Sequence, residues 1–352
     1  MKEVVVAMSG GVDSSVTLLR LKELGYAPVG LTLTMWDKYH SEQYKDAVRR
    51  ARRVCDKIGI RHVSLDVRAA FEAIIVDHFV DEYLKGVTPN PCVECNPKVK
   101  WKSIIDFADQ NGIGQVATGH YARVEVNSDS RRFEILKGLD PRKNQSYVLW
   151  QLSQEYLART ILPLGMLHKT EVYQIAEKYS FRDENQSESQ DVCFIPHNSY
   201  RDFLEKHVPE RLKAIPKGEL VDEAGKVLGQ HNGFYNFTIG QRKGFRMGFG
   251  ERRYVKQIDA GQNRVVIGDN PALFRSEMII QRVNWVSQTP QDELEGSMQI
   301  RYNHPGVECR VTRISAEKYR VTFAEPQRAV TPGQSAVLYR GDKLLLGGII
   351  YQ

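Results

Sequence analysis

The sequence lacks any apolar run long enough to cross a bilayer, and it has only five cysteines in 352 residues. A membrane-spanning helix needs about 20 consecutive apolar residues. The opening MKEVVVAMSGG stops at glycines after a short apolar run, which is typical of a buried first strand and not of a signal peptide. Five unevenly spaced cysteines do not indicate a secreted disulfide framework. We therefore predict a cytoplasmic protein with no membrane partner, in which neighbouring cysteines serve metal binding or catalysis.

A strong excess of one charge is also missing. The formal net charge is +6, which favours an anionic partner only weakly. The hydrophobic content of 41% and the charged content of 26% are ordinary for a folded protein, so disorder is not indicated. A chain of this length normally divides into two or three domains.

The first third of the chain alternates short apolar runs with amphipathic stretches. Strands are expected at VVVAM, VGLTLTMW and RHVSLDV, with a helix over about 14–24 and a long helix before Ile60. This alternation predicts an α/β domain built on a doubly wound parallel sheet. Residues 115–118 form another strand candidate, and 122–138 are expected to form a hairpin inserted at the end of the sheet. Helical periodicity covers 146–162 and 170–179.

The later part of the chain changes character. A polar stretch, DENQSESQD, precedes VCFIP, and from about Gly218 nearly every segment is a short strand between turn residues. We place a catalytic α/β domain at 1–198, a small central domain at 199–270 and a C-terminal β-barrel at 271–352.

Residues 9–15 read SGGVDSS, directly after the first strand and before a helix. Two glycines allow a tight turn that presents backbone N–H groups, and the helix N-terminus adds positive potential for a phosphate. The lysine of a Walker A loop and the GxGxxG spacing of a dinucleotide fold are both absent.

This loop resembles the pyrophosphate-binding loop of the PP-loop ATP pyrophosphatases, which adenylate an oxygen of their substrate and release pyrophosphate. The resemblance implies that the loop holds the β- and γ-phosphates of ATP through Ser9, Gly10, Gly11, Asp13 and Ser14. It also implies that Asp13 helps to orient Mg²⁺. An ordinary glycine-rich turn is the competing interpretation.

A second motif, TPNPCVECNPKVKWK at 88–102, places Cys92 and Cys95 just before a helix. The helix dipole and the lysines at 98, 100 and 102 are expected to favour a thiolate and so lower the thiol pKa. A structural zinc site is the alternative, but it would need a second CxxC or a histidine pair, and none is present.

Five motifs together resemble the bacterial tRNA-specific 2-thiouridylases, which make 2-thiouridine at the wobble position of tRNA. They are TPNPxxxCN, ATGHYAR at 117–123, KNQSYVLWQL at 143–152, SQDVCFIP at 189–196 and TIGQRKG at 238–244. The resemblance runs along the whole chain. It implies a PP-loop domain followed by two tRNA-contacting domains, with ATP adenylating the C2 oxygen of uridine 34 and a cysteine-borne sulfur displacing AMP.

The resemblance also implies roles for individual residues. Cys95 is the nucleophile and Cys193 carries the persulfide. The positions matched to ATP binding are Ala7, Met8, Ser9, Gly10, Gly11, Val12, Asp13, Ser14, Leu33 and Gly119. The positions matched to tRNA binding are Asn90, Pro91, Cys92, His120, Lys143, Asn144, Gln145, Arg301, Tyr302 and Gln334. The implied partners are tRNA acceptors for Lys, Glu and Gln and a sulfur donor, either a cysteine desulfurase or a relay protein.

The chain departs from the family pattern at Cys92, where an aspartate is usual. Cys92, Cys95 and Cys193 are therefore also candidates for three ligands of a [4Fe–4S] cluster with one open iron. We predict persulfide transfer first and the cluster as the alternative. ATP and Mg²⁺ are the other implied cofactors.

The remaining motifs have simpler interpretations. Cys55 and Cys309 lie on apolar patterns and are expected in the core. The arginine run at 49–53 is expected to be a solvated helix face, and the basic, aromatic segment 240–254 is expected to contact RNA. Two rival functions are another PP-loop ligase, which would not need Cys95, and a non-catalytic ATP-sensing RNA-binding protein, which would tolerate loss of Cys95 and Cys193.

Overall fold

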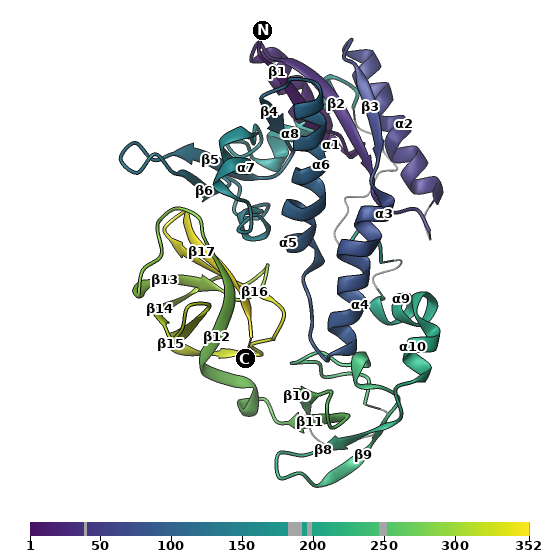
Figure 1. Ribbon diagram of the computed structural model, residues 1–352, viewed down its shortest axis with the longest axis vertical. Helices are drawn as coiled ribbons and strands as arrows, with labels where there is room; N and C mark the ends of the chain where they lie inside the picture. Colours follow the sequence, from purple (N-terminus) through teal and green to yellow (C-terminus); the bar gives the residue numbers. More distant parts are fainter. Residues whose placement is uncertain (39–40, 182–191, 196–198, 246–251, 352) are drawn as a thin grey trace.

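The computed structural model describes residues 1–38, 41–181, 192–195, 199–245 and 252–351, with only the backbone described over 41–45. Figure 1 shows a parallel sheet with its helices at the top, a small domain at the bottom and a barrel beside the helices that join them. Among the described helices, none combines the length and apolar character that a membrane span requires.

The N-terminal sheet is parallel throughout and has the order β3-β2-β1-β4-β7. Its residues alternate between two apolar cores because successive side chains of a strand point to opposite faces. Val5 packs with helix α6, whereas Val4 and Val6 pack with α1, α2 and α8. Its strands are β1 (Glu3–Ala7), β2 (Ala27–Thr34), β3 (His62–Asp66), β4 (Gln115–Ala117) and β7 (Thr160–Ile161). The covering helices are α1 (Val12–Glu23), α2 (Ser41–Lys57), α6 (Lys102–Gln110) and α8 (Lys169–Lys178).

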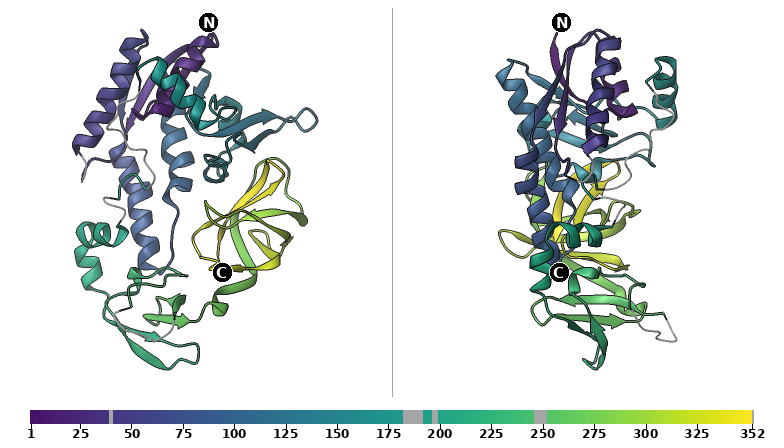
Figure 2. Two further views of the ribbon diagram at one scale, coloured as in Figure 1. Left: turned by 180° about the vertical axis from the view of Figure 1, so that it is seen from behind. Right: turned by 90° about the vertical axis from the view of Figure 1, so that its right-hand side faces the viewer.

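Two helical columns run from this sheet toward the small domain (Figure 2). Each contains a π-helical segment, a form that is frequent at functional sites. The first comprises α3 (Arg68–Phe71), η1 (Glu72–Val76) and α4 (Asp77–Leu84), and the second comprises α5 (Pro91–Cys95), η2 (Asn96–Trp101) and α6.

The central domain packs on the first column. Phe203 and Val255 share an apolar core with Phe71 and Phe79. Its sheet has the order β10-β11-β8-β9. The elements are α9 (Tyr200–His207), α10 (Pro209–Lys213), β8 (Gly218–Val221), β9 (Val227–His231), η5 (Phe234–Asn236), β10 (Tyr254–Asp259) and β11 (Arg264–Gly268).

The C-terminal part is a six-stranded barrel, closed by pairing of its first and last strands. The α/β fold class with a C-terminal β-barrel is therefore confirmed. After η6 (Pro271–Leu273), its strands are β12 (Phe274–Trp285), β13 (Glu293–Gln299), β14 (Val307–Arg313), β15 (Lys318–Arg328), β16 (Ser335–Arg340) and β17 (Lys343–Ile350).

Two local expectations differ from the structure. The hairpin of β5 (Ala122–Val126) and β6 (Phe133–Lys137) forms as predicted, but it joins the barrel through β17 and not the parallel sheet. Residues 146–162 are not one helix. They form η3 (Ser146–Val148), α7 (Gln154–Arg159) and edge strand β7, because their apolar side chains fill the junction with the barrel.

Trp150 is the centre of that junction and is 1% exposed. Its indole Nε1 donates to Ser335 Oγ at 3.0 Å, and the neighbouring Tyr147 hydroxyl donates to the Ser335 carbonyl at 2.7 Å. A Cβ atom built on Gly347 would lie 2.3 Å from Trp150 Cδ2, so the ring occupies space that any side chain would need.

We predict that Gly347→Ala destabilises the protein by about 1–3 kcal/mol, because the added methyl group overpacks the junction against a fixed indole ring. The measurement is the urea midpoint followed by tryptophan fluorescence. Gly114→Ala is the matched control, because its Cβ would meet nothing within 4 Å. Equal midpoints for the two variants would contradict the tight fit at Gly347.

Candidate active site

The predicted phosphate loop lies between β1 and α1. Gly10 has a φ of +74°, and a Cβ there would lie 2.3 Å from the Ala47 carbonyl oxygen, so glycine is required on both counts. The Ser14 hydroxyl donates to the Gly11 carbonyl at 2.9 Å and accepts from the Ser9 N–H at 3.2 Å. The loop is thus closed by its own hydroxyl groups into a turn at a helix N-terminus, which suits an anion.

Asp13 is held by two residues that the sequence analysis did not select. The Lys169 ammonium lies 2.7 Å and 2.9 Å from the two carboxylate oxygens of Asp13, and the Tyr121 hydroxyl donates to the nearer one at 2.7 Å. The Lys169 side chain is only 7% exposed. Tyr121 stood inside the ATGHYAR motif, but no local signal marked Lys169, which is 156 residues away from Asp13.

The arginine run at 49–53 is only partly a solvated face. Arg52 and Arg53 are exposed, as expected. Arg50, however, donates from Nε to the Gly10 carbonyl at 3.2 Å. Helix α2 therefore supports the phosphate loop directly, a contact that a charge pattern alone could not reveal.

The segment after β4 lies against the phosphate loop. A Cβ on Gly119 would lie 3.1 Å from the Asp13 carbonyl carbon and 3.2 Å from the Ser14 nitrogen. The order β3-β2-β1-β4 reverses direction between β1 and β4, which is where open α/β sheets bind ligands. Of the other predicted ATP-binding positions, Ala7, Met8 and Val12 border this end of β1, and Leu33 lies near the corresponding end of β2.

Cys95 ends α5 and is 7% exposed, packed in the apolar core that also contains Val99 and Phe194. Burial raises the pKa of Cys95 to about 11, although the charge of Lys100 opposes the shift. The expectation of a lowered thiol pKa is therefore wrong: desolvation outweighs the nearby cations.

The three lysines of the motif also have partners of their own. Lys98 forms an ion pair with Glu94, and Lys102 pairs with Asp106. Lys100 donates to Asn96 Oδ1 at 2.9 Å. Of the three, only Lys100 contributes its charge at Cys95.

His120 lies between the phosphate loop and the second helical column, whose helix α5 carries Cys92 and Cys95. The centroid of its ring lies 5.3 Å from that of Trp101 in η2, and Nδ1 is 2.8 Å from the Thr118 hydroxyl. Burial and then the charge of Lys100 lower the pKa of His120 well below its usual value, so the ring is neutral at physiological pH. The charge of the same lysine also acts on Cys92 and Cys95.

Cys193 is exposed, while the next residue, Phe194, is 1% exposed and packs edge-on against Trp36 and Phe79. Residues 189–191 and 196 of its motif lie outside the described residues. Within the described ranges, no three His, Cys, Asp or Glu side chains lie close enough together to hold a metal ion. Cys92, Cys95 and Cys193 therefore form no such metal-ion site, and the [4Fe–4S] cluster stays a prediction.

Several predicted tRNA-binding residues gather beside Cys92, which is exposed. Burial raises the pKa of the Tyr302 hydroxyl. The positive charge of Lys143 lowers that pKa and the charge of Cys92 raises it, so both groups lie near enough to Tyr302 to act on it. The Tyr302 hydroxyl donates to the Asn144 carbonyl at 3.2 Å. Arg301 comes from the same barrel loop and donates to the Arg328 carbonyl at 3.3 Å.

Other residues of that set have structural contacts as well. The Asn144 side chain accepts from Gly138 and Ser146, and Gln145 Oε1 accepts from the Tyr121 N–H at 2.9 Å. Asn90 is the residue before α5, and Pro91 is its first residue. The predicted RNA-contacting loop lies partly at 246–251, outside the described residues.

Gln334 joins the barrel to the cysteine loop. Its side-chain amide donates to the carbonyls of Thr88 at 2.8 Å and Pro89 at 3.4 Å. The Thr88 N–H donates to the Pro332 carbonyl at 3.2 Å. A Cβ on Gly333 would lie 2.3 Å from Val87 Cγ1, so the two loops are in close contact. The tRNA contact that the resemblance implies for Gln334 stays a prediction, and the structure shows that its side chain is hydrogen-bonded to the loop before the cysteines.

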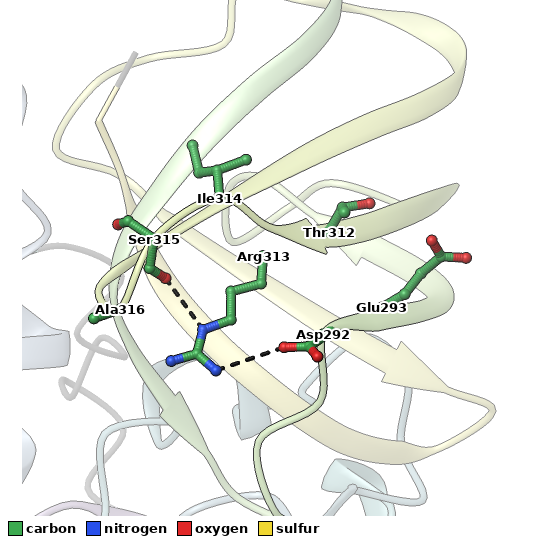
Figure 3. Close-up of a pocket in the computed structure, with 7 residues that line it drawn as sticks. All are labelled: Asp292, Glu293, Thr312, Arg313, Ile314, Ser315 and Ala316. Carbon is green, nitrogen blue, oxygen red and sulfur yellow. Dashed lines mark hydrogen bonds and ion pairs between the residues drawn. The ribbon is translucent and has the colours of Figure 1, made fainter.

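A separate pocket lies on the barrel and is drawn in Figure 3. The Arg313 side chain crosses it, paired with Asp292 at 3.5 Å and donating to the Ser315 carbonyl at 3.2 Å. None of the residues that line this pocket is a predicted site residue.

Cys55 and Cys309 are buried in apolar cores, as expected.

Comparison with known proteins covers the whole chain. Family models match at 2–197 ("tRNA methyl transferase HUP domain"), 201–269 ("tRNA methyl transferase PRC-barrel domain") and 275–350 ("Aminomethyltransferase beta-barrel domain"). The tRNA-specific 2-thiouridylase MnmA of Carboxydothermus hydrogenoformans is 44% identical, covering 99% of this chain and 97% of the relative. The proteins of the same name from Synechococcus sp. and Geotalea uraniireducens are 43% and 41% identical to this chain. Both alignments cover 99% of this chain, and they cover 93% and 95% of the two relatives. The chain therefore belongs to the family of tRNA-specific 2-thiouridylases.

Proposed function

We propose that this protein is a tRNA sulfurtransferase that uses ATP to convert a uridine of tRNA to 2-thiouridine. The observation that carries the proposal is the convergence of two motifs. Gly119 and His120 follow one strand. Gly119 lies against the phosphate loop, and His120 lies beside Trp101 at the end of η2, which directly follows the helix that carries Cys95. An ATP site and a buried thiol therefore border one site.

In the proposed first step, the phosphate loop binds ATP, and the C2 oxygen of the uridine attacks the α-phosphorus. Pyrophosphate leaves, and the C2 oxygen becomes part of a good leaving group. Lys169 and the loop N–H groups would balance the charge of the departing pyrophosphate. Mg²⁺ would supply further charge neutralisation, and Asp13 is the carboxylate of the loop that would hold it.

In the proposed second step, Cys193 carries a persulfide whose terminal sulfur bonds to C2 as the C2–O bond breaks and AMP leaves. Cys95 then attacks Cys193 Sγ, which leaves the sulfur on the base and forms a disulfide between the two cysteines. An external thiol must reduce that disulfide before the next turnover. Exposed Cys193 suits loading by a separate sulfur-donor protein.

The tRNA would contact the barrel loop at Arg301 and Tyr302 together with Lys143. A wobble uridine must leave its stacked position to present C2 to a cysteine. Acceptors for Lys, Glu and Gln, and domains bounded at 1–198, 199–270 and 271–352, remain parts of this proposal.

Replacing Cys95 or Cys193 with alanine should abolish 2-thiouridine formation, because each sulfur takes part in a bond that forms or breaks. ATP binding should remain, since neither residue belongs to the phosphate loop. The measurement is mass spectrometry of nucleosides from tRNA incubated with ATP and a persulfide donor. Cys309→Ala in the barrel is the control. Thiolation by the Cys95 variant at the wild-type rate would remove Cys95 from the mechanism.

Alkylation of Cys95 by iodoacetamide should accelerate steadily with pH, by about tenfold per unit, with no plateau below about pH 10. The folded pKa is raised to about 11, so the reactive thiolate is the minor form at neutral pH and increases as pH rises. Peptide-level mass spectrometry would follow the labelling. A plateau near pH 7 would show that the lysines and the helix dipole dominate after all.

Lys169→Met should raise the KM for ATP by about tenfold or more, because it removes a buried cation and leaves Asp13 to repel the triphosphate. Pyrophosphate release with saturating tRNA would measure this. Lys178→Met, at the exposed end of the same helix, is the control. An unchanged KM in the Lys169 variant would remove this residue from the ATP site.

A further inference from the structure

Glu94 lies between the two cysteines of the CVEC turn and is a buried carboxylate with three partners. Its side chain is 6% exposed. Oε1 accepts from Arg282 at 3.0 Å and from Gln151 at 3.1 Å, and Lys98 pairs with Oε2. Burial alone would raise the pKa of Glu94, but the hydrogen bonds from Lys98 and Gln151 and the charge of Arg282 lower it overall, so the group is ionised.

Arg282 comes from a different domain, on barrel strand β12. Its φ is +54°, in the left-handed region that an arginine seldom adopts, and the register of β12 with β17 shifts between Gln281 and Asn284. A bulge of this kind re-aims a side chain. Backbone strain of this kind persists only where the surroundings impose it.

Stability does not explain this arrangement. Replacing a buried ion pair with apolar side chains is often neutral or stabilising, whereas a buried pair can fix one arrangement among several. Both cations are half exposed, with Arg282 at 48% and Lys98 at 44%, so only the carboxylate is deeply desolvated. The carboxylate belongs to the same short helix, α5, as Cys92 and Cys95.

We propose that Glu94 and Arg282 are a positioning pair that holds the cysteine turn in register with the barrel surface that receives tRNA. The inference rests on the proposed thiolation. Gln151 adds a third support from the segment that carries Lys143, so elements on both sides of the tRNA site meet at one carboxylate. The pair acts through Cys95 and touches neither ATP nor the base.

The test uses the full-length protein with Glu94→Gln, Arg282→Gln and the double variant. Glutamine keeps the shape of the carboxylate but removes its charge. We expect kcat for 2-thiouridine formation to fall by about tenfold in each single variant, with the KM for ATP within about twofold of wild type. The double variant should lose no more than the worse single variant, because the two residues act as one unit.

Glu134→Gln is the matched control. Glu134 is also a buried carboxylate, 7% exposed, and it pairs across β6 and β17 with Lys343 at 2.8 Å, but away from the cysteine turn. This variant should keep the wild-type kcat even if its urea midpoint falls. A tenfold loss of kcat here as well would show that any break in the barrel contact suffices and would overturn a specific role for Glu94.

A second measurement does not depend on turnover. Peptide-level alkylation should label Cys95 about threefold faster in Glu94→Gln and Arg282→Gln than in wild type, because the turn that buries it loosens. Cys309 labelling should not change. A wild-type kcat together with unchanged Cys95 labelling in these variants would refute the positioning role of Glu94 and Arg282. A wild-type protein that makes no 2-thiouridine would instead refute the proposed function, and the Cys95 labelling rates would still show whether Glu94 and Arg282 hold the helix that carries Cys95.

Discussion

The parallel pairing of β1 with β4 is the constraint on which the rest of the site depends. It places the turn after β4 directly against the backbone of the phosphate loop, where a Cβ on Gly119 would crowd Asp13 and Ser14. The strand order reverses here, at the position where open α/β sheets bind their ligands. His120 then carries the contact onward to Trp101 on the cysteine helix.

The barrel completes the site from the opposite side. Gln334 holds the carbonyls of the cysteine loop, Arg282 reaches the carboxylate between the cysteines, and Trp150 is enclosed by Gly347. These contacts come from three different strands or loops of the barrel. The C-terminal domain therefore contacts both the loop before the cysteines and the helix that carries them.

Local patterns predicted the parts of the structure that depend on neighbouring residues. The phosphate loop needs only a strand, two glycines and a helix start, all of which are contiguous at 3–15. Lys169 and Arg282 could not be found in this way, because each meets its carboxylate across more than 150 residues of chain. The pKa of Cys95 was mispredicted for the same reason: the lysines are local, but the apolar core that desolvates the thiol includes distant Phe194.

The most direct test of the central claim follows an oxygen atom. A tRNA carrying ¹⁸O at C2 of the target uridine would be thiolated with ATP, and the released AMP and pyrophosphate would be weighed by mass spectrometry. Adenylation of the C2 oxygen predicts that the label appears in AMP, in a one-to-one ratio with 2-thiouridine. Unlabelled AMP, or label in pyrophosphate or water, would show that ATP activates something other than that oxygen.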